Sequence, residues 1–150
     1  MILKYHGVIR DLGMHTYLIK VIMEGQFGIG LIINAMLYVR GHRWDYDHWS
    51  ELGNQGWSYD EILPYFKKAE HNEVHDNDYH GQNGPLNVCD ISHQPESCKS
   101  FVEVGSKLYN YTDDFNGEQQ EGFGYYQTTQ INGKRCSAAK AYLVPVLDRD

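Results

Sequence analysis

The segment Ser58–Ala69 carries the strongest local folding signal in the chain. Ser58 stands three residues before Glu61, which is the capping-box pattern of a helix start. An apolar stripe at helical spacing follows, made of Ile62, Leu63, Tyr65 and Phe66. Pro64 lies inside this stripe and predicts a kink or a break after Leu63. The sequence therefore predicts a helix with an interruption near its middle.

Other segments also have helical patterns. Asp45–Leu52 carries Trp44, His48, Trp49 and Leu52 at helical spacing, and Gly53 is the expected stop. Glu96–Leu108 begins near Pro95 or Ser97 and places Phe101, Val104 and Leu108 on one face. Ser137–Leu147 predicts a helix interrupted at Pro145, and Asn34–Val39 is compatible with the opening of another helix before a turn at Arg40–His42. The aromatic residues of these helices are expected to provide core or lid packing: Trp44, Trp49, Trp57, Tyr59, Tyr65 and Phe66.

Short strands are predicted between the helices. Leu86–Val88 and Gly124–Ile131 have strand composition. Asn132-Gly133 is a strong hairpin-turn signal, after which Lys134–Ser137 is expected to return antiparallel. Two further short strands are expected near Ile2–Ile9 and Met14–Met23, whereas His71–Pro85 and Asp113–Gly124 are expected as loops. The predicted fold class is α+β.

Composition excludes several classes of function. The chain has 13 basic and 20 acidic residues, a net charge of −7, and no Lys/Arg run interleaved with aromatics, so nucleic-acid binding is not expected. The apolar stretch of residues 17–39 is interrupted at Lys20, Glu24 and Gln26, and its uninterrupted part is too short to cross a bilayer. The first residues also lack a signal-peptide pattern. A cytoplasmic protein is expected, with peripheral attachment to a membrane as the alternative.

The cysteines give no sign of a structural framework. Cys89, Cys98 and Cys136 are odd in number and show no CxxC or metal-ligand spacing. A pair between Cys89 and Cys98 is conceivable, but free thiols in a reducing compartment are favoured.

No catalytic residue and no metal site follows from the residues alone. Gly28-Ile29-Gly30 resembles the start of a dinucleotide-binding fingerprint, but Ile33 occupies the place of the third glycine. His71, His75 and His80 lie near Asp76 and Asp78, yet their spacing matches no structural zinc pattern, and a solvated loop is favoured. His42 and His48 could each serve as a base, with a scaffold role favoured, and Ser137 lacks the GxSxG elbow of a hydrolase.

Ordered motifs along most of the chain resemble one known family. The stretch IINAMLYVRG at Ile32–Gly41 is similar to the GGSSSINAMxYxRG signature of glucose–methanol–choline (GMC) oxidoreductases. Further matches to the family pattern follow in order: Asp45–Trp49, Gly53-Asn54, Gly56-Trp57, Leu63–Glu70, Tyr79–Gly81, Gly84–Val88, Asp113–Gly117, Gln120–Gly122, Asn132-Gly133 and Ser137–Leu143. The resemblance covers roughly residues 28–147 and is nearest to the alcohol and choline dehydrogenase branch.

This resemblance implies an FAD-dependent enzyme that oxidises an alcohol CH–OH group to an aldehyde, with hydride passing to flavin N5. The implied fold is a Rossmann-like FAD domain and a substrate domain with an antiparallel sheet. The chain would supply a remnant of the first domain, lid helices and part of the second. By resemblance, the residues along the flavin are Gly28, Asn34, Ala35 and Met36. Ile33 stands where members with covalent flavin carry His, so non-covalent FAD is implied, with a small alcohol as substrate.

The chain also departs from the family pattern. Gly28-Ile29-Gly30-Leu31-Ile32 replaces the Gly-Gly-Ser-Ser-Ser part of the signature, and residues 1–27 do not resemble the family at all. We therefore expect a divergent segment at 1–27, or one read in another frame, followed by a partial GMC domain at 28–150. The ADP-binding motif and the catalytic His region are absent. The alternative function is accordingly a non-catalytic remnant, or a partner subunit that cannot hold FAD alone, with or without a companion chain.

Overall fold

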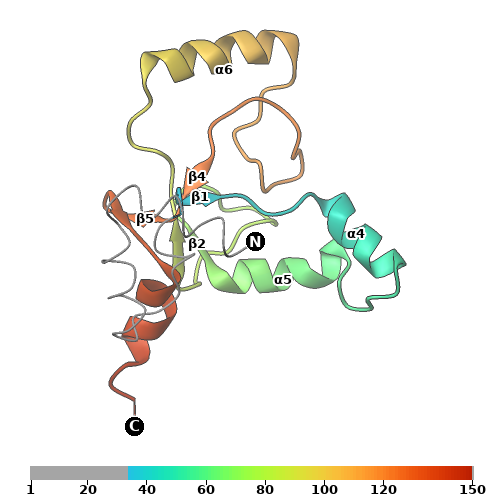
Figure 1. The fold of residues 1–150 in the computed structure, drawn as a ribbon, viewed down its shortest axis with the longest axis vertical. Coiled ribbons are helices and arrows are strands. Elements are labelled where there is room, and N and C mark those ends of the chain that lie inside the picture. Colours follow the sequence, from blue (N-terminus) through green and yellow to red (C-terminus); the bar gives the residue numbers. More distant parts are fainter. Residues whose placement is uncertain (1–33, 150) are drawn as a thin grey trace, which may run out of the picture. The chain divides into compact units, whose positions relative to one another are not determined.

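A computed structural model describes residues 34–149 of the chain, and residues Met36–Asp150 belong to one compact unit. The described part combines helices with short paired strands, which agrees in outline with the predicted α+β class (Figure 1). The strands expected near Ile2–Ile9 and Met14–Met23, and the expected boundary between residues 27 and 28, lie outside the described residues.

Helix α4 spans Arg43–Glu51 and confirms the prediction made for Asp45–Leu52. Its N-cap is His42, whose Nδ1 accepts a hydrogen bond from the Trp44 backbone N–H at 3.2 Å. The Asp45 side chain accepts a hydrogen bond from the His42 backbone N–H at 3.1 Å, which completes a capping box. Gly53 ends the segment with a φ of +100°, a conformation that glycine adopts at low cost.

Helix α5 spans Tyr59–Ala69 with Ser58 as its N-cap, as the sequence predicts. Glu61 accepts from the Ser58 backbone N–H at 3.1 Å. Of the kink or break expected after Leu63, the break is wrong, because the helix continues through Pro64, while the kink stays a prediction. Proline removes one backbone donor here, and the helix nevertheless runs on to Ala69.

The helix opening expected at Asn34–Val39 is also wrong. Leu37–Tyr38 forms strand β1 and pairs antiparallel with β4, Gln127–Thr128. Met36 has a φ of +63°, which no right-handed helix contains, and its carbonyl accepts from the Thr129 N–H at 2.8 Å. Instead of the expected turn, the chain then runs into the extended N-cap of α4, where His42 has φ −66° and ψ 144°.

Strand β2, Glu70–Asn72, follows α5 directly and pairs parallel with β3, Leu86–Val88. The prediction for Leu86–Val88 is confirmed, while the predicted loop at His71–Pro85 begins later because its first residues belong to β2. Gly84 lies against the end of α5, and its N–H donates to the Glu70 carbonyl at 2.9 Å. A Cβ at Gly84 would overlap the backbone of Ala69 and Glu70, so this turn requires glycine.

The remaining elements follow the predicted order. Helix α6 spans Glu96–Leu108, and the predicted strand at Gly124–Ile131 is interrupted at Thr129 into β4 and β5, Gln130–Ile131. The hairpin is confirmed: β5 pairs antiparallel with β6, Lys134–Arg135, and Asn132 and Gly133 have φ values of +49° and +71°. The predicted helix at Ser137–Leu147 is irregular, with a π-helical turn at Ala139–Leu143 and a 3₁₀ turn at Val144–Val146 around Pro145.

Polar side chains dominate the buried interior of the described part. The buried hydrophobic residues are Tyr59, Ile62, Val88, Cys136 and Ala141, whereas the buried polar set is larger: Arg40, Glu70, Asn72, His80, Asn87, Thr112, Asn116, Gln127 and Thr128. Of the aromatic residues expected in core or lid packing, Tyr59 is in the core, whereas Trp44, Trp49, Trp57 and Tyr65 are exposed, so the lid alternative stays a prediction for them. All three cysteines are unpaired. None of the helices within residues 34–149 is long and apolar enough to cross a membrane.

The close approach at Gly84 gives a test of the fold. We expect Gly84→Ala to lower the free energy of unfolding by about 3 kcal/mol, because the added methyl group meets backbone atoms that cannot move independently. Gly53→Ala is the matched control, because its Cβ would enter open space and only the positive φ costs about 1 kcal/mol. Urea unfolding of both variants measures the difference, and equal losses would contradict the packing at Gly84.

Candidate functional site

A buried carboxylate, Glu70, lies at the centre of the largest group of interacting charges in residues 34–149. Its side chain is fully buried at the junction of α5 and β2. Oε1 accepts from Asn72 Nδ2 at 2.8 Å and lies 2.9 Å from His80 Nδ1. Oε2 pairs with the Nη2 group of Arg40. One carboxylate therefore joins three segments of the chain.

Arg40 is held in place by both its backbone and its side chain. It follows β1, and its backbone N–H donates to Asn116 Oδ1 at 2.8 Å. Its Nη1 group donates to the Tyr79 carbonyl at 2.8 Å, and the guanidinium lies 5.1 Å from the centre of the Phe66 ring. The ring face attracts the cation, and the hydrogen bonds fix its orientation toward Glu70.

The imidazole of His80 lies between two carboxylates. Nδ1 faces Glu70, and Nε2 lies 2.9 Å from Asp114 Oδ2. A ring nitrogen must carry a proton to donate to a carboxylate, so donation on both sides requires the imidazolium form. Burial by itself lowers the pKa of His80, but the hydrogen bonds to Asp114 and Glu70 and the charges of both more than offset this, so the pKa lies above its ordinary value.

The carboxylate partners shift in the opposite direction. Burial alone raises the pKa of Glu70, while hydrogen bonds from His80 and Asn72 and the charge of Arg40 bring it below its ordinary value. Burial likewise raises the pKa of Asp114, and the hydrogen bond and charge of His80 outweigh that effect and lower it. These shifts favour the state in which all four groups are ionised. We call Arg40, Glu70, His80 and Asp114 the charge network.

Neutral amides extend the charge network toward the β1–β4 pair. Asn72 Nδ2 donates to Gln127 Oε1 at 2.8 Å, and Gln127 Nε2 donates to Asp90 Oδ1 at 2.9 Å. Asn72 Oδ1 also accepts from the backbone N–H groups of Val74 and His75, which shapes the start of the loop after β2. The amides therefore connect strands that lie far apart in the sequence.

The arrangement is suited to structure and not to proton transfer. Two positive and two negative groups balance each other, and the side chains of Arg40, Glu70 and His80 have exposed fractions of 1%, 0% and 0%. Both ring nitrogens of His80 are occupied by carboxylates, so the ring has no nitrogen left for a substrate. We conclude that the charge network positions the surrounding segments.

The residues that the resemblance assigns to flavin contact are not members of the charge network. Gly28 lies outside the described residues. Asn34 and Ala35 are exposed, and Met36 adopts the left-handed backbone conformation just before β1. The open pockets along α4–α5 and beside α6 are lined by other residues. Neither of these two pockets includes Asn34, Ala35 or Met36, and the flavin contacts assigned to these residues stay predictions.

The histidines considered as metal ligands or bases have different surroundings. His80 was expected in a solvated loop, which is wrong because the ring is buried in the charge network. His71 Nδ1 pairs with the Gln82 carbonyl, and His75 stacks against His80 with ring centres 5.1 Å apart. Within the part of the chain that the structure describes, no three His, Cys, Asp or Glu side chains gather as a metal site. His42 caps α4 and His48 pairs with Glu51 on its exposed surface, so both have scaffold roles.

Sequence reasoning missed the charge network because its members are spread over the chain. Arg40, Glu70, His80 and Asp114 each lie inside a motif that matches the family pattern, and this was the available signal. The pairing itself depends on the parallel β2–β3 register and on the return of residues 113–117, which the local sequence does not encode.

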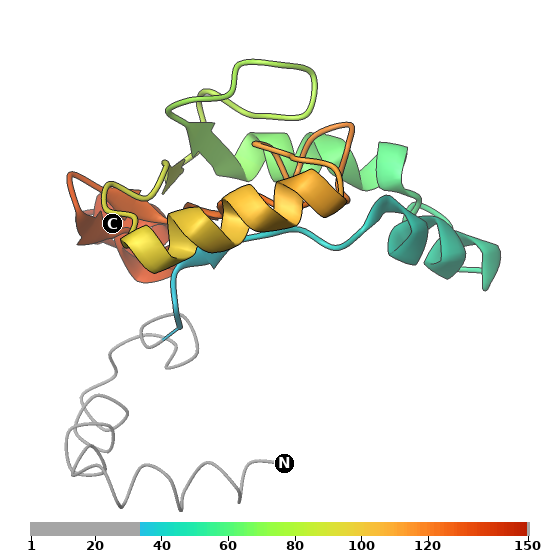
Figure 2. The same ribbon diagram turned by 90° about the horizontal axis from the view of Figure 1, so that it is seen from above.

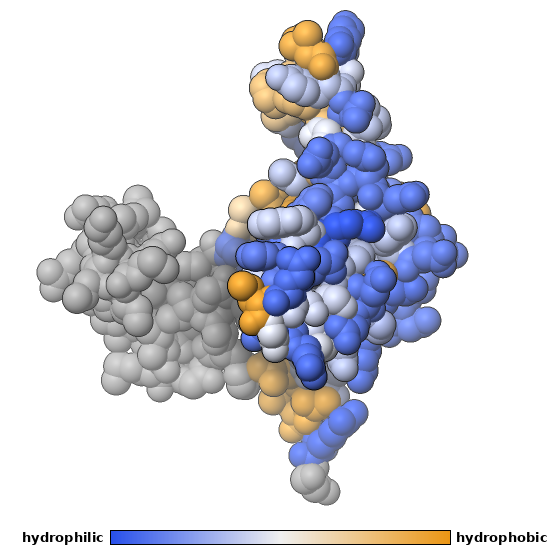
Figure 3. Space-filling model, turned by 90° about the vertical axis from the view of Figure 1, so that its right-hand side faces the viewer, coloured by the Kyte–Doolittle hydropathy of each residue, from blue (hydrophilic) through white to orange (hydrophobic). Residues whose placement is uncertain are grey.

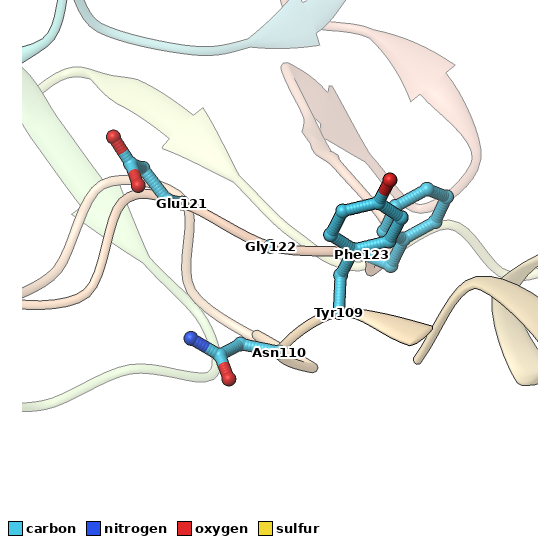
Figure 4. Close-up of a pocket in the computed structure, with 5 residues that line it drawn as sticks. All are labelled: Tyr109, Asn110, Glu121, Gly122 and Phe123. Carbon is cyan, nitrogen blue, oxygen red and sulfur yellow. The ribbon is translucent and has the colours of Figure 1, made fainter. Parts of the chain in front are cut away.

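Two open pockets lie on the surface. A groove of about 500 Å³ between α4 and α5 is lined by Tyr46, Gly56, Trp57, Ile62, Tyr65 and Phe66. A second, of about 260 Å³, lies at the end of α6, where the Tyr109 and Phe123 rings stack with centres 5.5 Å apart (Figure 4). Neither contains a member of the charge network; the lining of the first is mostly aromatic and apolar, and that of the second also includes Asn110 and Glu121.

The pKa shifts predict a maximum of stability at mildly acidic pH. The contribution of His80, whose pKa is raised, is complete below about pH 6.5 and is lost as the pH rises through the folded-state value. The contributions of Glu70 and Asp114 are complete above about pH 4.5 and are lost as the pH falls. We expect the free energy of unfolding, measured with urea, to peak between these values.

Substitution of one histidine tests the origin of the alkaline decrease. His80→Gln is expected to be less stable and to show a smaller decrease on the alkaline side, because it cannot lose the imidazolium proton. His48→Gln, at an exposed position, is the control and should keep the wild-type profile. If the free energy of unfolding of His80→Gln fell at alkaline pH as much as that of the wild type, deprotonation of His80 would not be its cause.

Removing one charge of the buried pair should be costly. Glu70→Gln is expected to lower the free energy of unfolding by about 3–5 kcal/mol, because Arg40 and His80 then remain buried without their shared counter-charge. Glu51→Gln removes an exposed carboxylate that pairs with His48 and should leave stability nearly unchanged. Thermal and urea unfolding measure both, and similar stabilities for the two variants would contradict the assigned role.

Comparison with known proteins places this geometry in context. The oxygen-dependent choline dehydrogenase of Brucella ovis is 48% identical over 118 residues, which is 78% of this chain. The enzyme of the same name from Rhizobium johnstonii is 45% identical over 119 residues. The chain spans 22% of the length of each of these curated relatives.

Solved structures show the same likeness. Pyridoxine 4-oxidase from Mesorbium loti matches with a TM-score of 0.73 and 28% identity, covering 78% of this chain and 24% of that protein. An FAD-dependent oxidoreductase from Chaetomium thermophilum matches with a TM-score of 0.73 and 26% identity, covering 79% and 23% respectively. A family model described as GMC oxidoreductase matches residues 19–150, so the expectation that residues 1–27 do not resemble the family is wrong for residues 19–27. The resemblance noted in the sequence is confirmed: the chain belongs to the GMC oxidoreductase family.

Proposed function

We propose that this chain supplies one structural section of an FAD-dependent oxidoreductase that acts on the CH–OH group of alcohols, and that the section does not catalyse the reaction alone. The family match and the 48% identity to a choline dehydrogenase support the reaction class. The chain spans 22% of that relative's length.

The closed charge network is the observation that carries the proposal. A general base must reach the substrate hydroxyl, and it needs a free lone pair to accept the proton. His80 is the histidine with a raised pKa, and it is both buried and engaged on each side by a carboxylate. The exposed His48 and the capping His42 have no assembled partner group beside a pocket.

The architecture supports a more specific assignment of the parts. We assign α4 and α5 to the lid and the antiparallel pairs β1–β4 and β5–β6 to the start of the substrate domain. FAD would be held without a covalent bond, because Ile33 offers no nucleophile. The left-handed Met36 is a conformation that costs free energy in a non-glycine residue, and such positions concentrate at ligand contacts. It therefore supports, with Asn34 and Ala35, a backbone contact to flavin in the complete protein.

A catalytically competent chain that binds FAD alone would contradict this proposal. The visible spectrum of the purified chain distinguishes the two. We expect the purified chain to be colourless and to retain no flavin after incubation with FAD and gel filtration, because the residues assigned to flavin contact line neither of the two pockets described above. The Brucella ovis choline dehydrogenase, treated in parallel, is the positive control. Near-stoichiometric flavin absorbance on this chain would overturn the proposal.

A further inference from the structure

Two neighbouring buried side chains each have a polar atom without a hydrogen-bond partner within residues 34–149. These atoms are Nε of Arg40 and the phenol oxygen of Tyr59. The two residues have exposed fractions of 6% and 2%, so bulk water does not reach the atoms. Leaving a buried donor unsatisfied is costly, and orphaned atoms of this kind often mark the position of a bound water molecule or ion.

The guanidinium of Arg40 lies beside the Tyr59 phenol. Burial raises the pKa of Tyr59, and the positive charge of Arg40 opposes this rise. No N–H group of Arg40 has hydrogen-bond geometry toward the phenol oxygen, however. The Nη groups have other partners, since Nη1 donates to the Tyr79 carbonyl at 2.8 Å and Nη2 pairs with Glu70. Nε is therefore the donor of Arg40 that a further ligand could use.

A second guanidinium, that of Arg43, lies over the Tyr59 ring. Its Cζ is 4.8 Å from the centre of this ring and 5.9 Å from the centre of the Tyr79 ring. Its side-chain hydrogen bond, from Nη2 to the Glu118 carbonyl, is long at 3.5 Å. The carboxylate of Asp47 accepts from the Tyr59 backbone N–H at 2.9 Å. No carboxylate of the described segment forms an ion pair with Arg43, so its charge lacks a counter-ion there.

The fold brings these groups together where two helices begin. Arg43 is the first residue of α4 and Tyr59 is the first residue of α5, and Figures 1 and 2 both show α4 beside the start of α5. The partial positive charge of a helix N-terminus adds to the charge of the two guanidinium groups. Figure 3 views the molecule from the side that carries α4, where hydrophilic residues form most of the surface. An ion therefore has a polar surface from which to approach.

The chemistry of the three side chains favours an anion over a water molecule. Arginine only donates hydrogen bonds, whereas a tyrosine hydroxyl donates or accepts. A water molecule brings two protons of its own, and of the three groups only the Tyr59 oxygen can accept one. An anion accepts from all three groups and supplies the counter-charge that Arg43 lacks. Because Arg40, Arg43 and Tyr59 line neither of the two pockets described above, the ligand is a small ion and not an organic molecule.

We propose that Arg40, Arg43 and Tyr59 bind one small inorganic anion of halide size, such as chloride. The anion accepts from Arg40 Nε, from the Tyr59 hydroxyl and from the Arg43 guanidinium. It thereby joins the segment after β1 to the first turns of α4 and α5. The site goes beyond the proposed function and does not depend on it, since none of the three residues is assigned to flavin.

The chloride dependence of stability tests the site in solution. The chain is titrated with sodium chloride in exchange for sodium methanesulfonate at constant ionic strength, and the thermal midpoint is measured. We expect the midpoint to rise and then saturate, because a ligand that binds only the folded state stabilises it in this way. Arg43→Gln and Tyr59→Phe should each raise the half-saturating chloride concentration at least about tenfold, because each loses a hydrogen bond to a charged ligand.

A matched control removes a positive charge elsewhere. Lys99→Gln changes the net charge by the same amount as Arg43→Gln, but at an exposed side chain of α6 that pairs with Glu96. It should keep the half-saturating concentration of the wild type. A wild-type midpoint that does not respond to chloride overturns the proposal, and so does the same half-saturating concentration in all three variants.

A crystal structure with bromide in place of chloride gives a second measurement that does not require the variants to fold. We expect an anomalous bromide peak in contact with Arg40 Nε and the Tyr59 hydroxyl. Bromide only at other, surface positions would identify an adventitious ion only and would overturn the site. A water molecule at this position, or a direct hydrogen bond between Arg40 and Tyr59, would overturn it as well.

Discussion

The ionised carboxylate of Glu70 is the interaction on which the rest of the described structure depends. It is buried at the end of α5 and satisfies the charges of Arg40 and His80 at once. Through these partners it fixes the segment after β1, the loop that follows β2 and the turn at Asp114. A buried charge without partners is expensive, so each of these segments has one position in which the charges are balanced.

Such a network contributes more to geometry than to net stability. Desolvation of four charged groups offsets much of their attraction. Proteins in which apolar residues replace a buried ion pair are often no less stable than the original. What an apolar core cannot reproduce is direction: Asn72 and Gln127 join the network through hydrogen bonds that define which strands lie beside one another. The small apolar core around Val88 and Ile62 gives no comparable specificity.

Local signals in the sequence predicted the elements well wherever adjacent residues determine the backbone. Ser58 and Glu61 specify the start of α5, and Asn132-Gly133 specifies the hairpin, because each needs only its neighbours. Met36 was misjudged because its left-handed conformation depends on the pairing of β1 with β4 and on the Thr129 hydrogen bond. Pro64 was expected to kink or break α5, but the helix continues through it to Ala69 with one backbone donor fewer.

The candidate site was harder to predict for the same reason. His80 stands in a polar, turn-rich segment, where a solvated side chain is the reasonable expectation. Its burial arises from Glu70 and Asp114, which are separated from it by 10 and 34 residues. For Trp44 and Trp49 on α4 the core alternative fails in the opposite direction, because they are exposed. Helical spacing shows that residues share a face, but it does not show whether that face is buried. Both errors concern long-range packing, which local spacing does not encode.

The protonation state of His80 tests the central claim most directly. Nitrogen NMR of the imidazole rings at about pH 6.5, where an unperturbed ring is half protonated, reports whether each ring nitrogen carries a proton, and loss of a signal set in His80→Gln assigns the resonances. The charge network predicts that both nitrogens of His80 are protonated at this pH, because each faces a carboxylate. A neutral ring with one unprotonated nitrogen would contradict it, since one of the two carboxylates would then lack its charged partner.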